Sequence, residues 1–160
     1  MNELILSKLD ANEVRANKGV VSVAETSASF VASSDAITSG PMLIPANSVI
    51  LDCYAVVKTQ LAYATATLGT RFGTEASGAQ IVALDADGLV GSSTALQVGK
   101  GNSTDAERNT SLSGAAAIVV VAGQAYSADQ RAIYGEVKAS TGAFTAGEVY
   151  FAVEYMVLGD

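Results

Sequence analysis

The sequence predicts an all-β fold of about eight short antiparallel strands, arranged as a sandwich or a barrel. Several segments alternate between apolar and polar residues with a period of two, as half-buried strands do. Turns rich in Gly, Ser, Thr and Asn separate these segments, and no repeat occurs at the spacing of a solenoid or propeller. With 160 residues and no dividing linker, the chain is expected to form one domain.

The N-terminal segment, residues 1–17, differs from the rest of the chain. Its apolar residues are Leu4, Ile5, Leu9 and Val14. Their spacing fits a short amphipathic helix, and an arm that becomes ordered only on a partner fits equally well. We therefore expect an N-terminal arm or short helix over residues 1–17 and a single β-sandwich domain over residues 18–160.

The first predicted strands lie before residue 60. Residues 20–23 open one strand, and a second runs through Phe30 and Val31. Residues 32–41 have the composition of a loop, and a turn over residues 45–48 leads into a strand over residues 49–59. The core-facing side of that strand is expected to be Val49, Leu51, Cys53, Ala55, Val57 and Thr59. The opposite side is Ile50, Asp52, Tyr54, Val56 and Lys58.

The middle of the chain predicts short strands and one long loop. A strand is expected over residues 65–72, and another over residues 81–84 runs into a turn at Asp85-Ala86-Asp87-Gly88. Residues 91–113 are predicted to be mostly loop. Within that loop we expect a short strand near residues 96–98 and one helical turn at Thr104 and Glu107, which have capping-box spacing.

The C-terminal part carries the most apolar strands. Residues 115–121 are wholly apolar and predict a central strand, and residues 131–138 predict another. A turn over residues 141–147 precedes the last strand, residues 148–158. Its inner side is expected to be Val149, Phe151, Val153, Tyr155 and Val157, and its other side Glu148, Tyr150, Ala152, Glu154 and Met156.

The charge content is low and its balance is acidic. Charged residues make up 16% of the chain, against about 25% in an ordinary soluble domain. A surface with few ions is less costly to dehydrate, which suits a protein packed among neighbours. The net charge is −7 and the basic residues are scattered, so we do not expect a nucleic-acid partner.

Most common catalytic and metal chemistry lacks its residues in this sequence. The chain has no His and a single Cys, which excludes Ser-His-Asp triads, His-ligated zinc and thiolate metal cages. We interpret Cys53 as an inert buried thiol. Asp85 and Asp87 fit neither register of an EF-hand loop, so a plain turn is favoured over an irregular calcium site. We therefore expect no cofactor and no enzymatic activity.

Two weaker motifs are rejected on their spacing. Gly99-Lys100-Gly101 lacks the other residues of a phosphate-binding loop. Glu148 and Glu154 lie six residues apart on one strand face, roughly 20 Å by strand rise, which is too far for paired-carboxylate hydrolysis. Glu136 could approach either of them across strands, which leaves a carboxylate enzyme as a minor alternative.

No targeting or membrane segment is expected. The apolar stretch at residues 4–6 is too short for the core of a signal peptide, and no run has the length of a membrane span. We expect the protein to be made and folded in a cytoplasm and to have no membrane partner.

The outward sides of two strands are unusually apolar. Ile50, Tyr54 and Val56 share a side with Asp52 and Lys58, where a lone sandwich would carry mostly polar residues. Tyr150, Ala152 and Met156 do the same on the last strand. Either both strands are central or covered by residues 1–17 or 91–113, or these sides form a subunit interface, where Tyr and Met are favoured.

Four segments in order resemble a known family. They are residues 43–52 (Leu-Ile-Pro-Ala-Asn-Ser-Val-Ile-Leu-Asp), 66–70 (Ala-Thr-Leu-Gly-Thr), 85–89 (Asp-Ala-Asp-Gly-Leu) and 145–155 (Thr-Ala-Gly-Glu-Val-Tyr-Phe-Ala-Val-Glu-Tyr). Together they resemble small virion structural proteins of tailed bacteriophages over residues 43–158, whereas residues 1–42 fit less well. The resemblance implies a jelly-roll β-sandwich, often trimeric, that decorates or cements the phage head. Some relatives belong to tails or fibres instead.

The sequence therefore predicts a head decoration protein that binds the major capsid protein as an oligomer, with a homotrimer implied, in a virion assembled in the host cytoplasm. The predicted interface residues are Leu4, Ile5, Leu9, Tyr54, Tyr150 and Met156. A receptor- or glycan-binding module of a tail or fibre is the alternative.

Overall fold

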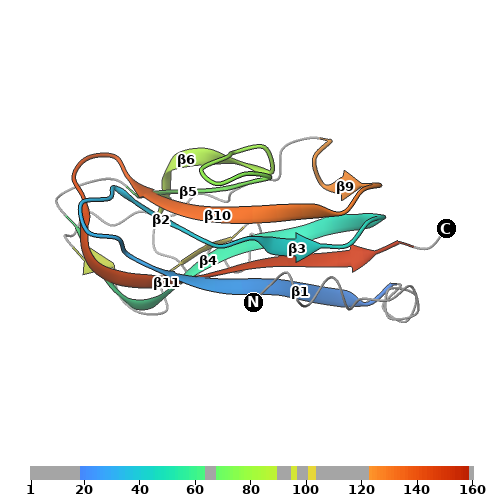
Figure 1. Cartoon of the computed structure of the whole chain (residues 1–160), viewed down its shortest axis with the longest axis horizontal. Coiled ribbons are helices and arrows are strands. Elements are labelled where there is room, and N and C mark those ends of the chain that lie inside the picture. Colours follow the sequence, from blue (N-terminus) through green and yellow to red (C-terminus); the bar gives the residue numbers. More distant parts are fainter. Residues whose placement is uncertain (1–18, 64–67, 90–94, 97–100, 104–122, 159–160) are drawn as a thin grey trace.

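The computed structural model describes residues 19–63, 68–89, 95–96, 101–103 and 123–158, which form two antiparallel sheets facing each other across an apolar core (Figure 1). The long strands of the first sheet are, in order, β1 (Val21–Ser29), β11 (Phe144–Val157) and β4 (Ser48–Tyr63). Three short segments pair along the other edge of β4: β7 (Ala95–Leu96), β8 (Gly101–Ser103) and β9 (Tyr126–Ser127).

The second sheet is built around β10 (Arg131–Ala139). On one side β10 pairs with β5 (Leu68–Gly73), which in turn pairs with β6 (Val82–Leu89). On the other side it pairs with β2 (Ala36–Thr38) and then β3 (Met42–Ile44). Pro41 lies between β2 and β3 and has no backbone N–H to donate to a ladder, so this edge strand is interrupted there.

The pairings are nested as in a long hairpin rolled onto itself. If β2 and β3 share one strand position, and β7, β8 and β9 share another, eight positions result. The first pairs with the last (β1 with β11), the second with the seventh, the third with the sixth and the fourth with the fifth. This is the arrangement of an eight-stranded jelly roll, so the predicted fold class is confirmed.

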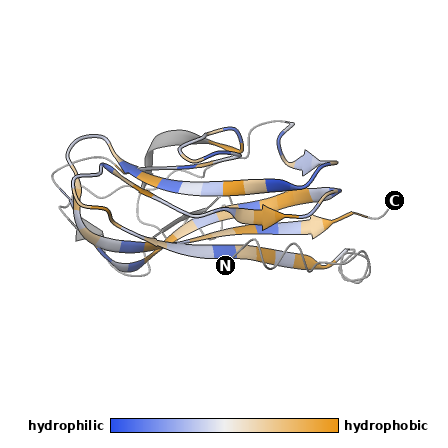
Figure 2. Cartoon of the chain, in the orientation of Figure 1, coloured by the Kyte–Doolittle hydropathy of each residue, from blue (hydrophilic) through white to orange (hydrophobic). Residues whose placement is uncertain are grey.

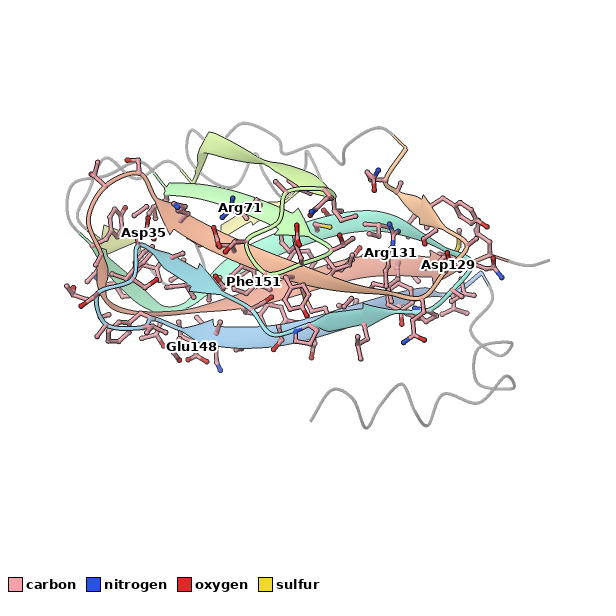
Figure 3. All side chains as sticks on the ribbon, turned by 45° about the horizontal axis from the view of Figure 1, so that its top comes forward. Asp35, Arg71, Asp129, Arg131, Glu148 and Phe151 are labelled. Atoms are coloured by element: carbon pink, nitrogen blue, oxygen red, sulfur yellow. The ribbon has the colours of Figure 1, made fainter. Side chains whose placement is uncertain are left out.

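The core lies between the two sheets and depends on close aromatic packing. Phe151 of β11 meets Phe72 of β5 edge to face, with ring centroids 6.2 Å apart. Gly135 of β10 makes room for this ring, since a Cβ there would lie 2.3 Å from Cδ1 of Phe151. Figure 3 shows Phe151 between the sheets. Cys53 is buried as predicted, and burial raises the pKa of its thiol.

Two predictions about the first strands are wrong. Residues 21–29 form one strand where a break before Phe30 was expected, because β11 pairs with the polar stretch without interruption. The loop predicted over residues 32–41 contains β2, whose central residue Ile37 is fully buried. A short strand with one buried side chain gives too little alternation to be recognised in the sequence.

The turn predicted at Asp85-Ala86-Asp87-Gly88 is also wrong, because the chain continues through these residues as β6. Between the pairs Thr70–Asp85 and Leu68–Leu89 the register shifts, with more residues on β6 than on β5. The turn-forming residues therefore produce a bulge rather than a chain reversal. The predicted apolar strand at residues 115–121 and the helical turn at Thr104 lie outside the described residues, as does the arm at residues 1–17.

Candidate functional site

The outer face of the first sheet is the surface on which the predicted interface residues lie. Along β11 the odd-numbered residues from Val149 to Val157 point into the core, as predicted, and the even-numbered ones point outward. Along β1 the odd-numbered residues are exposed and the even-numbered ones are half-buried against the core. Both strands follow the alternation of an antiparallel sheet that is covered on one face only.

One end of this outer face is an apolar row that crosses four strands. Cross-strand pairing places Met156 of β11 between Val21 of β1 and Val49 of β4, and Val49 is paired with Tyr126 of β9. Val21 and Tyr126 are 55% and 51% exposed. Residues paired in this way have neighbouring side chains on one face, so the four form a continuous strip, called the apolar row below.

A bulge in β4 adds to the apolar row. Glu154 pairs with Asp52 and Tyr155 with Ile50, so Leu51 is an extra residue on β4. Ile50 is buried in the core, and Leu51 is 43% exposed. The predictions that Val49 and Leu51 face the core and that Ile50 faces outward are therefore wrong, because one inserted residue shifts the alternation. In Figure 2, the start of β1, which forms one end of the apolar row, has the hydrophobic colour.

The centre of the outer face carries two aromatic residues and a glutamate. The rings of Tyr54 and Tyr150 lie 6.4 Å apart between centroids. Tyr150 donates a hydrogen bond from its hydroxyl to Oε2 of Glu25 on β1. Partial burial raises the pKa of Tyr150, and the hydrogen bond to Glu25 raises it further. The phenol therefore stays neutral at physiological pH and ties β1 to β11.

The far end of the outer face is polar and carries an ion pair. Lys58 donates to Oε1 of Glu148 at 2.8 Å, and both side chains are partly exposed. The carboxylates along β1, β11 and β4 are Glu25, Asp52, Glu148 and Glu154, and Lys58 is the one amine on these outward positions. This face therefore has an apolar strip at one end and an ion pair at the other.

Part of the outer face of the second sheet, around Glu136, is covered by other residues of the chain. Glu136 of β10 is only 1% exposed although it points away from the core. Its carboxylate accepts hydrogen bonds from Thr38 of β2 and Ser77, and Arg71 of β5 ion-pairs with it. Ser77 lies in the tight loop between β5 and β6. We call Thr38, Arg71, Ser77 and Glu136 the carboxylate cluster.

The position of Glu136 bears on the minor carboxylate-enzyme alternative. Glu136 lies on the second sheet and points away from the first, so it does not join Glu148 and Glu154, which project from the opposite outer face. Within the ranges that the structure describes, no three His, Cys, Asp or Glu side chains are grouped to hold a metal ion. The same residues contain no helix of membrane-spanning length and hydropathy.

The predicted interface residues divide into two sets. Tyr54, Tyr150 and Met156 share the outer face of the first sheet. Leu4, Ile5 and Leu9 lie outside the described residues, and so does most of the 91–113 segment proposed as a cover. Four further apolar residues of this face are exposed and were not predicted from the sequence: Val21, Val23, Leu51 and Tyr126. No local sequence pattern identifies these residues, because only the pairing of β1, β11, β4 and β9 brings them to one face.

Comparison with known proteins gives a fold likeness. No protein-family model and no curated protein matches the sequence. A chain of the cyanophage Pam1 capsid asymmetric unit matches with a TM-score of 0.50 and 20% identity, over 89% of this chain and 87% of that one. A chain of the capsid of Ralstonia phage GP4 matches with a TM-score of 0.49 and 17% identity over the same shares. At this identity the Pam1 match shows that the two chains share a fold.

Proposed function

We propose that this chain is a non-enzymatic structural protein of a phage virion that decorates the head and binds the major capsid protein. The chain shares its fold with a chain of a cyanophage capsid, and this supports a phage head as the site of its partner. The four sequence segments that resemble virion proteins of tailed phages lead to the same proposal. On this view the chain works by burying surface against a lattice after assembly in the host cytoplasm.

The apolar row is the observation that carries the proposal. The loop between β5 and β6 covers Glu136 of the second sheet, whereas Val21, Leu51 and Tyr126 of the first sheet remain exposed. Large exposed apolar areas are uncommon on monomeric proteins and mark contact surfaces. A contact that buries about 1,600 Å² in total gives stable attachment, and many copies on one shell strengthen it.

Self-association completes the proposal. The resemblance implies a homotrimer, and Tyr54, Tyr150 and Met156 are the candidates for contacts of the outer face. Residues 1–17 are proposed as an arm that adds a second contact to the lattice. Two attachment points on one chain raise the strength of binding beyond either contact alone.

The test mixes the purified chain with heads assembled without it and measures co-sedimentation, after the mass of the chain alone has been measured by light scattering. We expect an oligomer that sediments with heads, and we expect removal of residues 1–17 to abolish binding while leaving a folded β domain. Binding to host cells or glycans without binding to heads would refute the proposal and favour a tail or fibre module. If the truncated chain still decorates heads, the arm is not an attachment point.

A further inference from the structure

We propose that the free edge of β1 is a docking site for an extended segment of the head subunit, which adds to the first sheet as one more strand. This inference rests on the proposed function and names the surface used. β1 is the last strand of its sheet, and no described strand pairs with its second edge. In Figure 1 it runs along the lower border of the sandwich.

The hydrogen bonds of β1 show which of its N–H and C=O groups point away from β11. Phe30 donates its N–H to the carbonyl of Gly147, in the same register that pairs Val21 with Met156. On the other edge of β11, Leu158 donates its N–H to the carbonyl of Asn47, the residue before β4. The even-numbered residues of β11 therefore bond to β4, and its odd-numbered residues bond to β1. Even residues of β1 therefore bond to β11. The N–H and C=O groups directed to the free edge belong to Val21, Val23, Glu25, Ser27 and Ser29.

Among the described residues, β1 shows few of the features by which proteins protect edge strands. Natural edges are shortened, bulged, or carry lysine or proline. β1 has nine residues, no register shift against β11, and neither Pro nor Lys between Val21 and Ser29. Its single charge is Glu25. A long, regular edge that no described strand pairs with is a template for strand addition.

The side chains of β1 indicate the chemistry of the incoming strand. Val21 and Val23 are exposed on the outer face at one end, Ser27 and Ser29 are exposed at the other, and Glu25 lies between them. A strand that fits the whole edge has apolar residues beside the valines, a lysine or arginine beside Glu25, and small polar residues beside the serines.

The same pattern argues against a second copy of β1 as the occupant. Antiparallel pairing that uses the full strand around a two-fold axis sets Glu25 opposite Glu25, Val23 opposite Ser27 and Val21 opposite Ser29. Like charges directly opposite each other are destabilising, and both valines lose apolar neighbours. The edge is therefore complementary to a foreign strand rather than to itself.

The test compares two substitutions at Ser27. Ser27→Pro removes an N–H directed to the free edge and leaves the bonds to β11 intact, whereas Ser27→Ala keeps the N–H and changes only the side chain. Binding of the full chain to heads assembled without it is measured by co-sedimentation, and hydrogen exchange of β1 is measured with and without heads. We expect slower exchange of β1 on heads, unchanged binding by Ser27→Ala, and about tenfold weaker binding by Ser27→Pro.

A second pair keeps the test valid if Ser27→Pro does not fold. Val23→Lys places a charge at the edge, and Val31→Lys places the same charge just beyond β1, at a residue that is 65% exposed. Only Val23→Lys should weaken binding.

Three outcomes would count against the docking site. If the unmodified chain binds heads but β1 exchanges hydrogen as fast as in the free chain, the docking site is wrong and the proposed function stands. If β1 is protected in an oligomer of the chain alone, the occupant is a second copy and the proposal is wrong. If the unmodified chain does not bind heads, both proposals fail.

Discussion

The two outer faces of the sandwich differ in how far the chain covers its own side chains. On the second sheet, Arg71 and Glu136 neutralise each other, and Ser77 from the following loop lies over the pair. On the first sheet, Val21 and Tyr126 stay exposed at the ends of the apolar row. The first arrangement is made by residues of one chain. On our proposal the second face binds another molecule, so the contrast separates a face that stabilises the chain from a face that recognises a partner.

The largest expected effect is on the carboxylate cluster. Glu136→Gln keeps the shape of the side chain but leaves the charge of Arg71 without its partner, so we expect a loss of about 3–5 kcal/mol in the free energy of unfolding. Urea denaturation measures it. Glu148→Gln is the matched control, because its ion pair with the half-exposed Lys58 contributes about 0–1 kcal/mol. Equal losses from both substitutions would contradict the contrast between the two faces.

The second effect is a loss of stability at alkaline pH. Burial raises the pKa of Cys53 above its ordinary value of 9.0 and raises those of Tyr63, Tyr150 and Tyr155 above 10.0. Each group is neutral below its ordinary pKa, and its contribution to stability is fully present there. Above that pH the unfolded chain ionises first, so the free energy of unfolding falls as pH rises beyond about 9.

Thermal unfolding at a series of pH values between 7 and about 11 measures this decline. Tyr150→Phe removes the tyrosine of the outer face that is tied to Glu25 and should make the decline shallower. Tyr126→Phe, which removes the hydroxyl of an exposed tyrosine on the same face, is the matched control. A slope that Tyr150→Phe does not alter would show that the core residues alone cause the decline.

The sequence predicts the regular parts of this molecule and misses the parts that depend on pairing. The inner side of β11 is correct from Val149 to Val157 because strict alternation of apolar side chains continues over the strand. The predicted alternation in β4 fails at Leu51, because this one extra residue reverses the sides of the residues before it. No local sequence pattern shows that it is there. The turn predicted at Asp85 fails because the neighbouring strand β5 accommodates turn-forming residues as a bulge.

The candidate site is predictable to a similar extent. Tyr54, Tyr150 and Met156 follow from the unusually apolar outward sides of two strands, and the structure places all three on one face. The apolar row and the carboxylate cluster do not follow, because their members come from segments far apart in the chain. Thr38, Arg71 and Glu136 are adjacent only because β2 and β5 pair with opposite edges of β10.

A smaller effect is expected from deleting Leu51. Without this residue, Ile50 remains directed to the core and Asp52 outward, so β4 pairs with β11 in regular register. We expect the melting temperature to change by the equivalent of about 1 kcal/mol or less, and binding to heads to weaken. Deletion of Ala55 is the control, since it reverses one side of a regular stretch and should abolish folding. An unfolded Leu51 deletion would show that the bulge is required for the fold.

The smallest effect on stability belongs to the apolar row itself. Val21→Ser and Met156→Ser change exposed or half-buried side chains on the face away from the core, so each should alter the free energy of unfolding by about 0.5 kcal/mol or less. Their effect should appear instead in binding to heads, which is measured on the same protein samples. Val31→Ser, at an exposed valine outside the row, should change neither quantity. If the serines on the row destabilise the isolated chain as much as Glu136→Gln does, the row is packed within one chain, and the division between a stabilising face and a recognising face is wrong.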